Sequence, residues 1–232
     1  MRIVVKYTIG EKVKYISHLD FMRAVQRALR RAEIPVAYSK GFNPHPRLSF
    51  ASALAVGTTS EGEYLDIVLE REMDPQILCY RMNEKLPEGI RFLKCVVVDE
   101  KAPSLMSLIK RGEYIIKISA PPFEQKDLSS LIKDFLEQRE ILMVKKTKKG
   151  NRQIDIRSMI HNMDLVNQDQ DWIIIKAMLS TGSKANLRPD QLAEALLDFA
   201  KISYGAELPL EIHRLDLYLF QDGKWVTPVE ME

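Results

Sequence analysis

The chain has 232 residues, a length that suits one large domain or two small ones. Hydrophobic residues make up 46% and charged residues 28%, a balance typical of a globular protein with a substantial core. The formal net charge of +2 is too small to indicate a class of partner, so the local distribution of charge has to be analysed instead.

The sequence contains no segment typical of a membrane protein or of a secreted one. No stretch approaches the roughly 20 apolar residues of a membrane span, and residues 1–14 lack the apolar run of a signal peptide. The two cysteines, Cys79 and Cys95, have no metal-ligand spacing, and we interpret them as free thiols in a reducing cytosol. We therefore expect a cytoplasmic protein with no metal, no cofactor and no membrane partner.

The first half of the chain predicts alternating strands and helices. The β-branched and aromatic run at 2–9 predicts a strand. Ser17 begins a capping box with Asp20 and predicts a helix from about 18 to about 33, which ends before Pro35. The further elements predicted are strands at 35–38, 48–54, 63–69 and 90–98, and a helix from Pro75 to about Lys85 that is capped by Asp74.

The predicted order of strand, helix, strand, strand, helix, strand is the ferredoxin-like split βαβ arrangement. The second half repeats this order loosely, with strands at 113–119, 141–146, 153–157, 172–179 and 210–220 and helices at about 123–138 and 189–201. The sequence thus predicts an α+β fold with two tandem ferredoxin-like (βαββαβ) halves, one at 1–103 and one at 111–232.

Arginines gather on one side of the first predicted helix. At about 100° per residue, five side chains fall within roughly a third of its circumference: Asp20, Arg23, Arg27, Arg30 and Arg31. A solvated helix face, with Asp20 paired to Arg23, would explain this pattern equally well. Residues 14–47 contain only two acids, however, and the guanidinium group suits phosphate, so we predict nucleic-acid binding here.

The loop SKGFNPHPRLSF at 39–50 follows directly in the chain. Its glycine and prolines predict a rigid, irregular path, on which Phe42 either anchors the loop or exposes a ring for stacking. The side chains that we expect to contact a phosphate or an unstacked base are Lys40, Phe42, Asn43, His45 and Arg47. A purely structural loop remains the alternative.

Three further groups of residues are candidates for a functional or structural role. His18, Asp20 and Tyr38 stand as acid–base or motif residues, since histidine titrates near neutrality. A basic hairpin around Gly150 forms a secondary nucleic-acid site of Lys145, Lys146, Lys148, Lys149 and Arg152, although lysines that protect a strand edge give the same pattern. Glu61, Glu63 and Asp66 are expected to pair with nearby arginines, and His161 and His213 receive no role. No catalytic residue is assigned, because the sequence has no nucleotide-binding, hydrolase, zinc-protease or kinase motif.

Residues 14–67 resemble the radical-SAM-linked domain of unknown function, through the motifs YISHLD, RALRRA, PVAYSKGFNPHP and SEGEYLDI. The match is weaker in the second half, where it depends on RPDQLAEAL at 188–196. The resemblance implies an accessory partner of a radical-SAM enzyme, and because this chain stands alone the partner is expected to bind in trans. It implies no established activity.

Three functional hypotheses follow from these observations. The first is an RNA-binding or substrate-presenting module, without catalysis of its own, that serves a radical-SAM enzyme in RNA modification or processing. The second is an endonuclease-like RNA-processing enzyme that uses His18 or His45 with Tyr38. The third is a pure protein-interaction adaptor.

Overall fold

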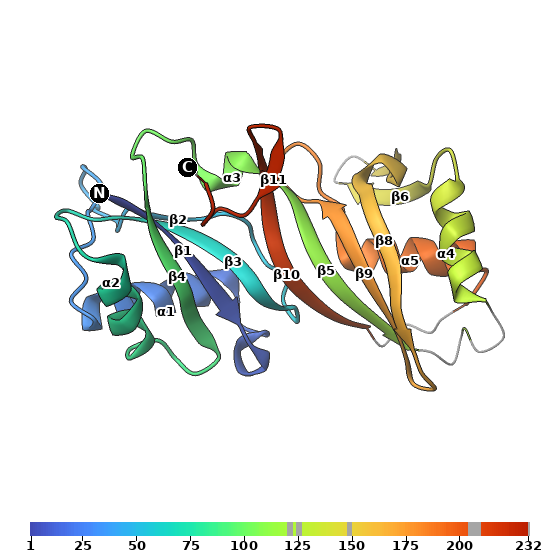
Figure 1. Ribbon diagram of the computed structural model, residues 1–232, viewed down its shortest axis with the longest axis horizontal. Coiled ribbons are helices and arrows are strands. Elements are labelled where there is room, and N and C mark those ends of the chain that lie inside the picture. The colour runs from blue at the N-terminus through green and yellow to red at the C-terminus, as the bar shows by residue number, and fades with distance from the viewer. Residues whose placement is uncertain (120–122, 124–126, 148–149, 204–209, 232) are drawn as a thin grey trace. The chain divides into compact units, whose positions relative to one another are not determined.

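The computed structural model describes residues 1–119, 123, 127–147, 150–203 and 210–231 (Figure 1). The chain forms two compact units. Residues 1–110 and 214–232 make the first unit, and residues 111–213 make the second. The last long strand therefore contributes its residues from Arg214 onward to the first unit, whereas the sequence placed the whole of 111–232 in one domain.

The first unit is a mostly antiparallel sheet with two helices packed on one face and a short third helix on the other. Its elements are β1 (Arg2–Ile9), α1 (His18–Arg31), β2 (Leu48–Phe50), β3 (Thr59–Val68), α2 (Pro75–Asn83), β4 (Ile90–Val98), α3 (Leu105–Leu108), β10 (Leu210–Gln221) and β11 (Lys224–Val226), with a 3-10 turn η1 (Glu11–Val13). The strand order is β4-β1-β3-β10, with β2 on β3 and β11 on β10. The close approach of β3 and β10 requires glycine, since a Cβ on Gly62 would lie 2.3 Å from the backbone of Asp216.

Each face of this sheet carries a hydrophobic core, because successive side chains along β1 and β3 point to opposite faces. Ile3 and Leu65 point to the face covered by α1 and α2, where they join one core with Val25 of α1. Val4 and Tyr64 point to the other face, in a second core with residues of α3 and β10. The two faces therefore have different neighbours, and this decides where each candidate site residue lies.

The second unit has its own hydrophobic core. Its elements are β5 (Ile109–Ser119), α4 (Leu128–Glu137), β6 (Leu142–Thr147), β7 (Gly150–Asp155), η3 (Arg157–Met159), β8 (Ile160–Gln168), β9 (Trp172–Ser180) and α5 (Pro189–Phe199). Strands β5, β9 and β8 pair in that order, while β6 and β7 form a separate two-stranded sheet. Helices α4 and α5 share one hydrophobic core with β5 and β9.

The predicted α+β class is confirmed, and the sheet is mostly antiparallel, as in the pairs β1–β3, β1–β4, β5–β9 and β8–β9. The strands predicted at 2–9 and 90–98 and the cap at Asp74 are confirmed, because Asp74 accepts from the backbone N–H of Gln76 at 2.7 Å. The arrangement of two tandem ferredoxin-like halves is not confirmed and stays a prediction.

Several predicted boundaries are wrong. The predicted strand at 35–38 is reduced to single bridges at Val36 and Tyr38, and the one at 48–54 to three residues, since the prolines of this segment have no N–H to donate to a ladder. Helix α4 begins at Leu128 rather than near Phe123, because Asp127 caps it by accepting from the N–H groups of Ser129 and Ser130. The sequence also missed α3, β8 and β11.

Candidate nucleic-acid interface

The N-terminus of α1 is held by the predicted cap. Ser17 Oγ accepts from the backbone N–H of Asp20 at 3.1 Å, and its own O–H donates to the Asp20 carboxylate at 2.8 Å. The hydrogen bond from Ser17 is the main reason that the pKa of Asp20 is lowered, with a further contribution from Arg23. The cap fixes the start of the helix and thereby the direction in which its arginines point.

The arginine face of α1, which we define as Arg23, Arg27, Arg30 and Arg31, is exposed along its length. Arg23 pairs with Asp20 at 3.3 Å, and Arg31 donates to the backbone carbonyl of Lys85, just after α2, at 2.6 Å. Within the described ranges, the side chains of Arg27 and Arg30 make neither a hydrogen bond nor an ion pair. Two guanidinium groups are therefore available to a ligand.

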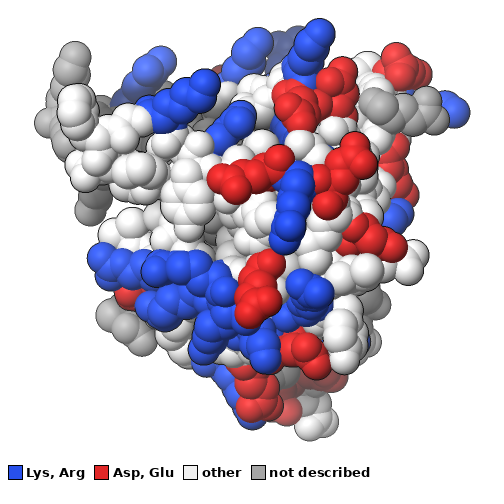
Figure 2. Space-filling view, turned by 90° about the vertical axis from the view of Figure 1, so that its left-hand side faces the viewer, with Lys and Arg blue, Asp and Glu red and all other residues white. Residues whose placement is uncertain are grey.

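Figure 2 looks at the molecule from the side on which α1 and α2 lie in Figure 1. Lys and Arg side chains gather in the lower half of this view, with a few Asp and Glu side chains beside them. In the upper half of the same view, Asp and Glu side chains are more numerous and lie mainly toward the right. This uneven distribution agrees with a basic patch rather than with a uniformly solvated surface.

Hydrogen bonds join the two ends of the loop at 39–47, whereas the residues at its tip are exposed. The N–H of Ser39 donates to the carbonyl of His45 at 2.8 Å, and the N–H of His45 donates to Ser39 Oγ at 3.0 Å. Tyr38 forms a bridge with Pro46. At the tip, Phe42 is fully exposed and so does not anchor the loop, and Lys40 and Asn43 are exposed beside it.

Arg47 faces away from α1. Leu48 and Phe50 pack in the core beneath α1, so alternation along the strand directs Arg47 and Ser49 to the opposite face of the sheet. There, Arg47 lines a cavity of about 340 Å³ together with Arg2, Ser49, Asp66 and Glu100. The structure thus places Arg47 among acidic groups on the other face from the arginine face, so the two do not share one groove.

A small cavity lies where α1 begins. It has a volume of about 30 Å³, roughly the space of one water molecule, and its polar lining includes Tyr7, Lys14, His18 and Glu63. The ring of His18 also meets the edge of Phe50, with 5.2 Å between centroids. His18 is exposed, with one edge of its environment formed by Phe50, and no contact among the described residues joins it to His45 or Tyr38.

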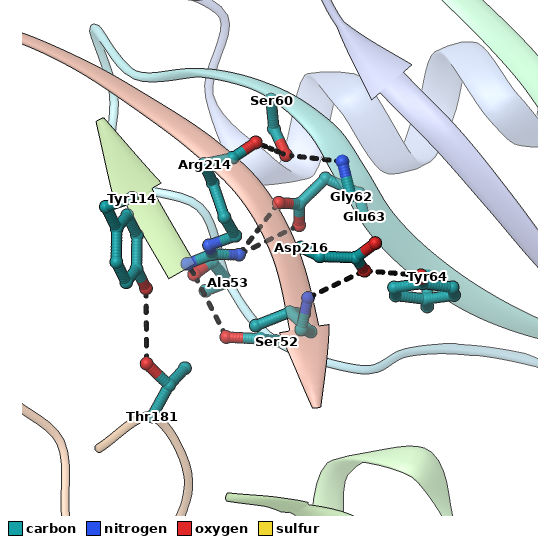
Figure 3. Close-up of polar contacts among 11 residues, drawn as sticks. Ser52, Ala53, Ser60, Gly62, Glu63, Tyr64, Tyr114, Thr181, Arg214 and Asp216 are labelled. Carbon is teal, nitrogen blue, oxygen red and sulfur yellow. Dashed lines mark hydrogen bonds and ion pairs between the residues drawn. The ribbon is translucent and has the colours of Figure 1, made fainter. Parts of the chain in front are cut away.

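Beneath this cavity is a buried ionic network between β3 and β10 (Figure 3). Arg214 donates to both oxygens of Glu63, at 2.8 and 3.0 Å, and Asp216 binds Tyr64 and Lys6. Burial raises the pKa of Glu63 above its usual range, and the positive charge of Arg214 opposes that shift.

Tyr7 lines the small cavity together with Glu63 of this network. Its side chain is almost completely buried, and burial raises the pKa of its hydroxyl, with a smaller contribution from the charge of Glu63. Sequence reasoning missed Tyr7, Arg214 and Asp216, because nothing local in the sequence shows that β10 runs beside β3. It expected Glu63 and Asp66 to pair with nearby arginines, and their partners are Arg214 and Arg2.

A second pair that the sequence missed lies in the second unit. His161 Nε2 is 2.9 Å from Ser180 Oγ, on neighbouring strands β8 and β9. The register of β8 shifts between Ile160 and Asn162, and a bulge of this kind re-aims the side chain that it contains. Desolvation lowers the pKa of His161, and the positive charge of Arg111 lowers it further.

The structure describes only part of the predicted basic hairpin. Lys145 and Lys146 belong to β6, in register with Arg152 and Asn151 of β7, but their side chains lie outside the described residues. Lys148 and Lys149 lie outside the described residues altogether. Arg152 is exposed. The secondary site therefore stays a prediction.

The described residues contain neither a candidate metal site nor a candidate membrane span. No group of three or more His, Cys, Asp or Glu side chains in that part of the chain is arranged to hold a metal ion. Among the same residues, no helix has both the length and the apolar character needed to cross a membrane.

Comparison with solved structures gives distant likenesses to two assemblies, one of them a ribonucleoprotein bound to RNA. A Cbf5–Nop10–Gar1 complex has a TM-score of 0.48 at 8% identity, over 93% of this chain and 48% of that chain. An H/ACA ribonucleoprotein bound to a substrate RNA containing 2'-deoxyuridine has a TM-score of 0.46 at 9% identity, over 91% and 46%. The present chain spans about half the length of these matched chains, and at such TM-scores the likenesses carry no functional inference.

Comparison with sequence families is more informative. No curated protein matches the chain. The model of DUF2344, described as an uncharacterized protein conserved in bacteria, matches residues 2–189, which is most of the sequence. The chain therefore belongs to the DUF2344 family of bacterial proteins.

Proposed function

We propose that the first unit binds a polyanion, with RNA as its expected ligand, through the arginine face of α1. The observation that carries this proposal is the exposure of Arg27 and Arg30, whose side chains have no hydrogen bond or ion pair to any other described residue. A guanidinium group on a regular helix is a rigid bidentate donor that matches phosphate oxygens. Arg23 and Arg31 extend the same face, although each already has a polar contact.

The tip of the 39–47 loop supplies a second, separate contact in this proposal. The exposed ring of Phe42 suits stacking on an unpaired base, an interaction that typically contributes about 1–3 kcal/mol. Lys40, Asn43 and His45 are exposed polar residues of the same loop. We leave Arg47 out of the contact, because it faces Asp66 and Glu100 on the other side of the sheet.

The role that we infer is that of an accessory module, which holds RNA for an enzyme that acts on it. The resemblance of residues 14–67 to the radical-SAM-linked family supports a radical-SAM enzyme as that partner in trans. The order β4-β1-β3-β2 around two helices supports a ferredoxin-like first half, an architecture that presents a sheet and helices as separate surfaces.

The test is fluorescence anisotropy of a labelled 20-nucleotide single-stranded RNA across a salt series. The variant Arg27→Glu/Arg30→Glu should bind at least tenfold more weakly than the wild type, and its log K against log salt slope should fall by about one per arginine. The matched control Arg139→Glu/Lys184→Glu makes the same charge change outside α1 and should bind normally. Equal loss in both variants, or a wild-type affinity that does not depend on salt, would refute the proposal.

A further inference from the structure

An apolar groove with an acidic wall runs between α4, α5 and β6 of the second unit. Its volume is about 360 Å³, within the range of about 300–1,000 Å³ that is typical of ligand sites. Most of its lining residues are apolar, among them Phe135, Met143 and Phe199. Gln138 is its neutral polar residue, and its charged residues are the two acids Glu194 and Asp198.

The β6 wall of the groove exposes apolar side chains that a monomer would normally cover. Leu142 is 52% exposed and Val144 is 55% exposed, while Met143 between them packs against the core. Strand β6 pairs only with β7 among the described strands. The exposed apolar side chains and the groove are continuous, as expected of a surface that a partner covers.

The α5 wall concentrates negative charge. Asp190, Glu194 and Asp198 follow one another at intervals of four residues, so they lie along one side of the helix, where like charges repel. Asp190 is paired with Arg188. Within the described residues, the side chains of Glu194 and Asp198 make no ion pair or hydrogen bond. Desolvation raises the pKa of Glu194, and the charge of Asp190 adds to this shift.

We propose that this groove binds a basic amphipathic helix of a protein partner. Apolar side chains of such a helix, one turn apart, would enter the groove beside Leu142 and Phe199. Its Lys or Arg residues would pair with Glu194 and Asp198 and so relieve the repulsion along α5. This is the helix-in-groove mode of peptide recognition. A nucleic acid is excluded as the occupant because the acidic wall repels phosphate. The inference is independent of the proposed RNA site, which lies in the first unit and has the opposite charge.

The test uses the whole chain and a fluorescein-labelled 18-residue peptide of Leu and Lys in an amphipathic helical pattern, followed by anisotropy. Glu194→Lys should weaken binding at least tenfold, whereas Asp171→Lys, the same charge change in the exposed turn before β9, should leave it unchanged. Ala195→Leu, which fills the groove without changing its charge, should also weaken binding. Circular dichroism confirms that each variant is folded.

Two further probes separate this proposal from simple charge attraction. A peptide with Gln in place of every Leu should bind at least tenfold more weakly, and one with Glu in place of every Lys should not bind. Equal binding of the Leu–Lys and Gln–Lys peptides, or unchanged binding by Glu194→Lys, would overturn the proposal. So would a dimer of the wild-type chain in sedimentation that Glu194→Lys dissolves, since the occupant would then be a second copy of this chain.

Discussion

Arg214 and Glu63 form a bidentate ion pair in the interior of the first unit, where 5% and 1% of their side chains are exposed. The two residues are separated by 151 positions in the chain. The pair joins the last long strand of the sequence to one near its start. Leaving a buried charge without its partner costs free energy. The stability of the first unit therefore depends on β10, which supplies Arg214.

Removing the guanidinium group should therefore destabilise the protein strongly. Arg214→Met keeps a side chain of similar length but leaves the Glu63 carboxylate buried without its main partner, and we expect a loss of about 3–5 kcal/mol in the free energy of unfolding. Urea denaturation measures this loss. The double variant Glu63→Gln/Arg214→Met removes the uncompensated charge as well and should recover part of it. A double variant less stable than the single one would contradict this account.

The loss should also depend on pH, because burial raises the pKa of Glu63 and Arg214 opposes the shift. Without Arg214 the pKa rises further. The stability contributed by the protonated carboxyl is present below the unfolded pKa of about 4.5 and is lost as the pH rises through the folded value. Arg214→Met should thus be less destabilised at pH 5 than at pH 8, whereas the double variant should not show this difference.

The pKa of His161 should lie below that of a free histidine, since desolvation and the charge of Arg111 both disfavour the imidazolium form. The stability that its neutral form contributes is present above the unfolded pKa of about 6.5 and is lost as the pH falls. Proton NMR titration of the imidazole signals, with His161→Gln to assign the resonance, measures the value. Arg111→Met should raise it. A midpoint at 6.5 or above in the wild type would show that the site is not desolvated.

The cap of α1 should contribute measurably to stability. Ser17→Ala removes the oxygen that accepts from the backbone N–H of Asp20, and we expect a loss of about 1 kcal/mol in the free energy of unfolding. Ser17→Asn supplies another acceptor and should retain most of that stability. Chemical denaturation of the three proteins distinguishes these outcomes, and equal stability of the Ala and Asn variants would show that the cap is unimportant.

Elements that depend on local signals were predictable from the sequence. The strand at 2–9 follows from a run of β-branched residues, and α1 and α2 follow from the caps at Ser17 and Asp74 and from apolar spacing. The exposure of Arg27 and Arg30 follows from the same helical period. Between Pro35 and Pro46 the local sequence pattern predicted a strand that does not form. Whether an extended segment joins a sheet depends on its pairing partners, which the local pattern does not contain.

The sequence did not predict which residues lie next to each candidate site residue in space. Arg47 and the arginine face are close in sequence, yet alternation along β2 directs Arg47 to the other side of the sheet. His161 received no role until β8 and β9 brought it to Ser180.

The sequence by itself determined the strands at 2–9 and 90–98, the starts of α1 and α2 and the charged face of α1, because caps and periodicity act over a few residues. Only the tertiary structure decided that Glu63 pairs with Arg214 and that acids on α5 border an apolar groove. Those contacts join segments far apart in the chain. The free energy that selects them comes from burying many side chains together, which no short stretch of sequence encodes.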